Sequence, residues 1–173
     1  LVIAEKPSVA RDLARVLGAT HRGDGYLEGP GLVISWCIGH LLELDDPKVY
    51  NPTWSTWRLE TLPMVPDSFS LRVRKGAEDQ WKVLHQLMRR KDVTSVVNAC
   101  DAGREGELIF RYAMQHADVA LPVERFWASS LTDEAIRQAW DRLRPALSVL
   151  TLVVSIDNAI DGVGMYQRLD TSV

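Results

Sequence analysis

Apolar residues along the chain follow two alternating patterns. Short apolar runs, typical of strands buried on both faces, occupy residues 1–4, 32–38, 93–100 and 123–128. Between them, apolar residues recur every three or four positions, which predicts helices over residues 8–17, 81–91, 105–116 and 132–143. Ser8 and Thr132 stand where helix N-caps are expected, and Gly18 stands where the first helix should end.

This alternation of strand and helix predicts the fold class. Strands that are apolar on both faces need helices on both sides, so we expect an α/β domain with a mainly parallel, Rossmann-like sheet of about four strands. Functional groups in such sheets lie beyond the carboxyl ends of the strands. That rule selects Glu5 and Lys6 after the first strand, and residues 101–105 after the third.

Residues 45–76 do not fit the alternation. Prolines recur through them, and the segment is too long for an ordinary connection. We expect an irregular excursion over the domain surface, with Trp54 and Trp57 as candidate anchors.

Composition narrows the class of protein. The chain has 173 residues, 46% of them hydrophobic, and a net charge of −3, which suits a folded domain and excludes nucleic-acid binding by bulk positive charge. Cys37 and Cys100 lie in apolar segments outside any CxxC pair, so we expect buried free thiols in a reducing compartment and no zinc. The longest apolar stretch, residues 147–156, is too short to span a bilayer, and no membrane partner is expected.

The strongest chemical signal is residues 98–107, which read Asn-Ala-Cys-Asp-Ala-Gly-Arg-Glu-Gly-Glu. Asp101 and Glu105 are carboxylates of the kind that bind Mg²⁺, and Arg104 has the planar fork that binds phosphate. Spacing alone leaves the alternative of a glycine-rich turn with capping acids equally open.

Glu5 and Lys6 give a second signal at the same edge. Glu5 could bind metal or act as a general acid, and Lys6 could neutralise a phosphate. The alternative is a simple ion pair of Glu5 with Lys6 or Arg11, with Ser8 as a helix cap. Because Glu5, Asp101 and Glu105 would repel one another without a cation, the combined pattern favours Mg²⁺-assisted chemistry on a phosphodiester. His40, after the second strand, is a weaker candidate phosphate contact.

Three ordered motifs resemble the amino-terminal Toprim domain of type IA DNA topoisomerases, in the bacterial topoisomerase III branch. They are Leu-Val-Ile-Ala-Glu-Lys-Pro-Ser-Val-Ala at residues 1–10, Trp-Cys-Ile-Gly-His-Leu-Leu-Glu-Leu at 36–44, and Ala-Cys-Asp-Ala-Gly-Arg-Glu-Gly-Glu-Leu-Ile at 99–109. The likeness covers residues 1–145. It leaves residues 146–173 as a tail of uncertain assignment, expected as a remnant or joint of a following domain.

The resemblance implies roles for several residues. Glu5 would assist proton transfer at the scissile phosphate, Lys6 and Arg104 would bind that phosphate, and Asp101, Glu105 and Glu5 would hold Mg²⁺. The family's Asp-x-Asp-x-Glu motif has Gly103 in its middle position here, which puts a second tightly held metal in doubt.

The resemblance also implies partners that this chain does not contain. The family cleaves single-stranded DNA through a tyrosine on a later domain, so the remaining topoisomerase domains are expected partners of a cytoplasmic bacterial protein. Two alternatives stay open, a self-sufficient Mg²⁺-dependent Toprim nuclease and a non-catalytic module that binds DNA or protein.

Overall fold

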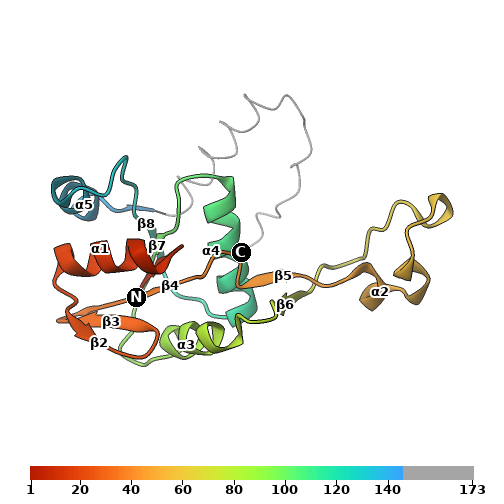
Figure 1. The fold of residues 1–173 in the computed structure, drawn as a ribbon, viewed down its shortest axis with the longest axis horizontal. Coiled ribbons are helices and arrows are strands. Elements are labelled where there is room, and N and C mark those ends of the chain that lie inside the picture. The colour runs from red at the N-terminus through yellow and green to blue at the C-terminus, as the bar shows by residue number, and fades with distance from the viewer. Residues whose placement is uncertain (146–173) are drawn as a thin grey trace.

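A seven-stranded sheet forms the centre of the computed structural model, which describes residues 1–145 (Figure 1). In spatial order its strands are β2 (His21–Arg22), β3 (Tyr26–Gly29), β4 (Leu32–Trp36), β1 (Val2–Ala4), β7 (Val96–Ala99), β8 (Val123–Arg125) and β9 (Arg144–Pro145). The four central strands, β4, β1, β7 and β8, are mutually parallel. They are the four strands that the apolar runs predict, and the predicted α/β class is confirmed.

The three remaining strands are antiparallel and lie at the sheet's edges. β2 and β3 extend one edge from β4, and β9 pairs with β8 at the other. The prediction of about four strands misses them because each is short and none of their residues is fully buried, so they leave no apolar run.

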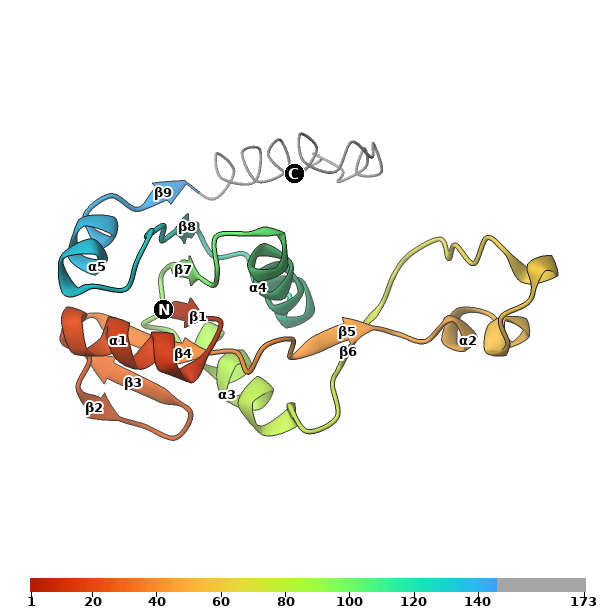
Figure 2. The ribbon, with the colours of Figure 1, turned by 45° about the horizontal axis from the view of Figure 1, so that its top comes forward.

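Helices cover both faces of the sheet (Figure 2). One face carries α1 (Pro7–Leu17) and α5 (Asp133–Trp140), and the other carries α3 (Glu78–Met88) and α4 (Arg104–Ala117). Strand β1 shows why both layers form: Val2 and Ala4 pack toward α1 and α5, and Ile3 packs toward α3 and α4. Alternate side chains of a strand point to opposite faces, so an all-apolar strand needs a helix layer on each side.

The helix ends follow the predicted signals at Gly18 and Thr132 but not at Ser8: α1 begins at Pro7 with Lys6 as its N-cap, so Ser8 lies within the helix and does not cap it. Gly18 adopts a left-handed conformation with φ of 83° and donates its N–H to the carbonyl of Ala14, which closes α1. At the start of α5, the Thr132 hydroxyl accepts a hydrogen bond from the N–H of Ala135 at 3.3 Å. No helix among the described residues has the length and apolar character needed to cross a membrane.

A long projection leaves the body of the domain between β5 (Leu42–Leu44) and β6 (Leu71–Val73), which form a separate antiparallel pair (Figures 1 and 2). We call residues 45–70 the arm. It contains the short helix α2 (Pro47–Tyr50) and the 3₁₀ turns η1 (Pro52–Ser55) and η2 (Leu59–Thr61), and none of its residues is buried. The predicted excursion is therefore present, but it extends away from the domain. Trp57 is 74% exposed and does not anchor it.

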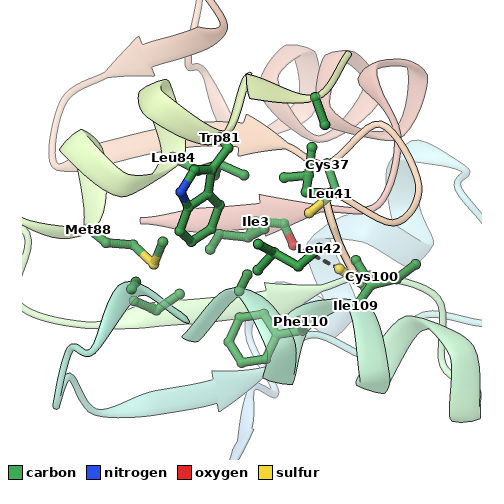
Figure 3. Close-up of a cluster of buried hydrophobic side chains, with 14 residues drawn as sticks. Ile3, Cys37, Leu41, Leu42, Trp81, Leu84, Met88, Cys100, Ile109 and Phe110 are labelled. Carbon is green, nitrogen blue, oxygen red and sulfur yellow. Dashed lines mark hydrogen bonds between the residues drawn. The ribbon is translucent and has the colours of Figure 1, made fainter. Parts of the chain in front are cut away.

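The two thiols lie in the core layer under α3 and α4 (Figure 3). Cys37 and Cys100 are both buried and free, as predicted. The Cys100 Sγ lies 3.8 Å from the carbonyl oxygen of Ile3. Hydrogen bonding with the Cys37 thiol, together with burial, raises the pKa of Cys100 well above its usual range. Residues 146–173, where a joint or remnant of another domain is predicted, lie outside the described residues.

Candidate active site at the carboxyl edge of the sheet

The carboxyl ends of β1 and β7 place Glu5 and Asp101 side by side. The strands are parallel neighbours in which Ala4 pairs with Ala99, so the residues that follow them emerge at one edge. Glu5 is 8% exposed, and its Oε2 accepts a hydrogen bond from the backbone N–H of Asp101 at 3.3 Å. A buried carboxylate thus lies directly against the turn that carries the second predicted acid.

Lys6 supplies positive charge at the same point. Its Nζ lies 3.3 Å from Glu5 Oε1, while its side chain remains 56% exposed. The ion pair considered as the alternative therefore forms. It does not consume the lysine, because an exposed ammonium retains other donors for a phosphate oxygen.

Glu105 and His40 form a second polar pair. Glu105 lies in the first turn of α4, and its carboxylate contacts Nε2 of His40. His40 follows Gly39, whose φ of 76° turns the chain after β4. The Glu105 side chain is 68% exposed, and Arg104 beside it is also exposed. Cationic and anionic groups that the sequence places after three different strands thus share one edge.

The three predicted carboxylates are not drawn onto a common point. Within residues 1–145, no three His, Cys, Asp or Glu side chains gather where they could hold a metal ion. The donor set still fits Mg²⁺ chemistry, because protein Mg²⁺ sites use one or two carboxylates and take their other oxygen ligands from phosphate or water. Glu5, Asp101 and Glu105 are the residues that would hold it, which remains a prediction.

A buried ionic network supports the site from behind. Glu107, on α4, is 7% exposed and accepts hydrogen bonds from Asn98 Nδ2 at 2.9 Å and from Arg111 Nε at 2.8 Å. Its Oε2 also lies 3.9 Å from Nη1 of Arg125, which is 2% exposed at the end of β8. A buried charge is tolerated when it is paired, so these residues join β7, α4 and β8.

Arg125 links this network to the predicted acid. Its Nη2 donates to the carbonyl oxygens of Cys100 at 2.8 Å and Asp101 at 2.7 Å. Burial lowers the pKa of the guanidinium, and Glu107 opposes that effect. Because both carbonyls belong to the turn after β7, Arg125 fixes the backbone from which the Asp101 side chain projects.

None of these supporting residues was predicted from the sequence. The sequence signal that could have identified them is a polar residue within each of two apolar segments: an asparagine in the buried third strand and an arginine in the short fourth strand. Such residues are rarely buried unless they are paired, so their partners had to lie nearby.

Gly106 makes the close approach of α4 to this turn possible. A Cβ atom at Gly106 would lie 2.2 Å from the carbonyl oxygen of Asp101, which no side chain can tolerate without movement. A Cβ atom at Gly103, the N-cap of α4, would meet nothing within 4 Å. The two glycines of the motif thus differ: a side chain at Gly106 would clash with the Asp101 turn, whereas Gly103 has room for one.

Comparison with known proteins agrees with this geometry. The family model described as Toprim domain matches residues 1–131. The chain is 48% identical to DNA topoisomerase 3 of Shouchella clausii over 151 residues, which cover 87% of this chain and 21% of that protein. It is 46% identical to DNA topoisomerase 3 of Bacillus subtilis over 144 residues, which cover 83% of this chain and 20% of that protein.

A solved structure shows the same fold. Full-length topoisomerase I from Thermotoga maritima aligns with a TM-score of 0.53 at 22% identity, covering 83% of this chain and 21% of that one. The chain therefore spans about one fifth of the length of these relatives. With the family model matching most of its residues, the parallel sheet expected of the fold, and paired polar groups at the expected edge, the chain belongs to the Toprim domain family.

Proposed function

We propose that this chain is the Toprim module of a bacterial type IA DNA topoisomerase of the topoisomerase 3 kind. One observation carries the proposal: a buried Glu5 lies against the Asp101 turn, in a chain 46–48% identical to two bacterial topoisomerase 3 proteins. In this role the module acts on single-stranded DNA in the bacterial cytoplasm. The nucleophilic tyrosine and the strand-passage domains belong to the polypeptide outside this segment.

The geometry supports a division of labour among the residues. Lys6 and Arg104, both exposed at the edge, bind the scissile phosphate through charge-assisted hydrogen bonds. Glu5, held by Lys6 and the Asp101 N–H, assists proton transfer to the leaving sugar oxygen as the tyrosine oxygen bonds to phosphorus and the bond from phosphorus to that sugar oxygen breaks. His40 contacts a neighbouring phosphate. Mg²⁺ bound by Asp101, Glu105 and Glu5 would offset the negative charge of the DNA backbone.

The metal part of the proposal is tested by thermal unfolding. Mg²⁺ that binds only the folded protein raises Tm by mass action, with about 2.7 kcal/mol gained at 100 times the Kd. We expect this rise in the wild-type chain and in the control Asp79→Asn, an exposed acid on α3, and a much smaller rise in Asp101→Asn. An equal rise in all three proteins contradicts Asp101 as a ligand.

The catalytic part is tested in a full-length enzyme. Residues 1–145 replace the matching segment of Bacillus subtilis DNA topoisomerase 3, and relaxation of negatively supercoiled plasmid is measured with Mg²⁺. We expect relaxation, and its loss in Glu5→Gln. The isolated chain should leave end-labelled single-stranded DNA intact, since the proposed tyrosine is elsewhere. Cutting by the isolated chain that disappears in Asp101→Asn would instead identify a nuclease.

A further inference from the structure

The arm carries large apolar side chains that residues 1–145 leave exposed. Leu59 is 84% exposed and Trp57 74%. The others of this kind on the arm are Val49, Leu62, Val65 and Phe69. Isolated exposed apolar residues are normal, but a group of them on one projection marks an interaction surface.

The arm is nevertheless a built element. The Tyr50 hydroxyl accepts from the N–H of Ser70 at 3.0 Å and donates to its carbonyl at 3.2 Å, which joins the two sides of the arm near its base. The Tyr50 ring also meets Phe69 edge to face at 6.2 Å. At the root, Arg72 bonds Asp46 at 2.9 Å. These contacts hold the backbone while the apolar side chains stay outside.

Charge decides between two classes of partner. The arm's acidic residues are Asp45, Asp46, Glu60 and Asp67, and its basic residues are Lys48 and Arg58. A net negative arm repels the DNA backbone, whose binding depends on neutralising phosphates with Lys and Arg. An apolar surface with few positive charges is better suited to bind another protein surface than to bind DNA.

The length of the relatives indicates which protein surface the arm would bind. They match this chain over only 20–21% of their length, so about four fifths of such a polypeptide lies outside it. We propose that the arm docks its apolar side chains onto an apolar surface of another domain of the same topoisomerase polypeptide. This inference rests on the proposed function only in taking the chain to be one module of such an enzyme.

The root of the arm connects docking to the candidate site. β5 and β6 both pack against α4, the helix that begins at Arg104 and carries Glu105. His40, which contacts Glu105, lies two residues before β5. A domain held by the arm is thus attached to the segment that shapes the site's edge.

Cysteine labelling tests the proposal without DNA or Mg²⁺. The native thiols of this chain, Cys37 and Cys100, are buried, and maleimide labelling of an introduced cysteine is followed on its own peptide by mass spectrometry. Leu59→Cys tests the arm, and Asp79→Cys, at a fully exposed position on α3, is the matched control. Each variant is labelled in the isolated chain and in the full-length chimaera with Bacillus subtilis DNA topoisomerase 3.

We expect labelling of Leu59→Cys to slow by about tenfold or more in the chimaera, a factor equivalent to 1.4 kcal/mol of protection, while labelling of Asp79→Cys keeps its rate. Equal rates for Leu59→Cys in both proteins would overturn the proposal. So would protection that appears only with added single-stranded DNA, or protection in the isolated chain that grows with its concentration, which would indicate a second copy.

A stability measurement gives an independent reading. Trp57→Ser combined with Leu59→Ser should leave the Tm of the isolated chain unchanged and lower that of the chimaera, because these side chains are covered only there. An unchanged Tm in the chimaera contradicts docking. Plasmid relaxation separates the two proposals: protection without relaxation supports docking and counts against the catalytic role.

Discussion

Two glycines three residues apart give opposite expectations for substitution by alanine. Gly106→Ala places a Cβ 2.2 Å from the Asp101 carbonyl oxygen, so the turn or the helix must move, and overpacking of this kind costs about 1–3 kcal/mol. Gly103→Ala fills open space and loses only a modest N-cap preference, less than about 1 kcal/mol. Urea unfolding measures both. Equal costs would mean that the close approach of α4 to Asp101 is wrong.

The thiol of Cys100 predicts how stability changes with pH. Its pKa is raised in the folded protein by hydrogen bonding with Cys37 and by burial. The unfolded chain therefore loses this proton first, near its ordinary pKa of about 8.5, and the folded state does not. Stability is full below that pH and falls as pH rises above it, by up to about 1.4 kcal/mol per pH unit. Unfolding between pH 7 and 10 should show a shallower slope in Cys100→Ala; an identical slope contradicts the assignment.

At the scale of elements, Arg125 joins β8 to the turn after β7 and to α4. Arg125→Met removes both hydrogen bonds to the turn and leaves Glu107 with less compensation, and breaking a buried pair typically costs about 3–5 kcal/mol. Arg111→Met is the matched control, since Arg111 bonds the same carboxylate from a side chain that is 38% exposed. Because Glu107 is buried, Arg111→Met also costs stability, but we expect a smaller loss, since Glu107 keeps its bond from Asn98 and no hydrogen bond to the turn is removed. Similar losses in the two variants would show that burial of Arg125 carries no special weight.

The elements that the sequence predicts most directly are the buried strands and the helix ends that act locally. β1 and β7 are buried along their whole length and β4 at its three central residues, so their apolar runs are unambiguous, and Thr132 and Gly18 act locally as caps. The edge strands β2, β3 and β9 were not predicted, because each is short and has no buried residue, so none of them leaves an apolar run in the sequence. The direction of the arm was also not predicted, because the sequence makes Trp57 a candidate anchor on the domain, whereas its side chain is 74% exposed.

The location of the candidate site could be predicted from the sequence, but only some of its side-chain contacts could. The rule that parallel strands share a carboxyl edge brings Glu5 to Asp101, as their positions after β1 and β7 require. The contact of Glu105 with His40 depends on the turn at Gly39 and on where α4 starts, which spacing does not specify. Arg125 lies on β8, next to β7 in the sheet. Its contact with Asp101 could therefore be identified only after the strand order was known.

At the scale of the whole molecule, the arm should be dispensable for folding of this domain. The N–H of Asp45 already donates to the carbonyl of Ser70 at 3.0 Å, so an Asn-Gly turn replacing residues 46–69 would close a two-residue hairpin. No residue of the arm is buried, and a shorter connection loses less entropy on closure, so stability should stay within about 1 kcal/mol of wild type.

Leu42→Ala, at the buried root of the arm, is the contrasting control and should cost about 2–5 kcal/mol. Cooperative unfolding of the shortened chain, measured by circular dichroism in urea, is the expected result. A shortened chain that unfolds without cooperativity would show that the arm belongs to the domain's own core. Retained stability would instead mean that the exposed apolar side chains contribute nothing within this domain, so any stabilisation by them has to come from the surface that they contact.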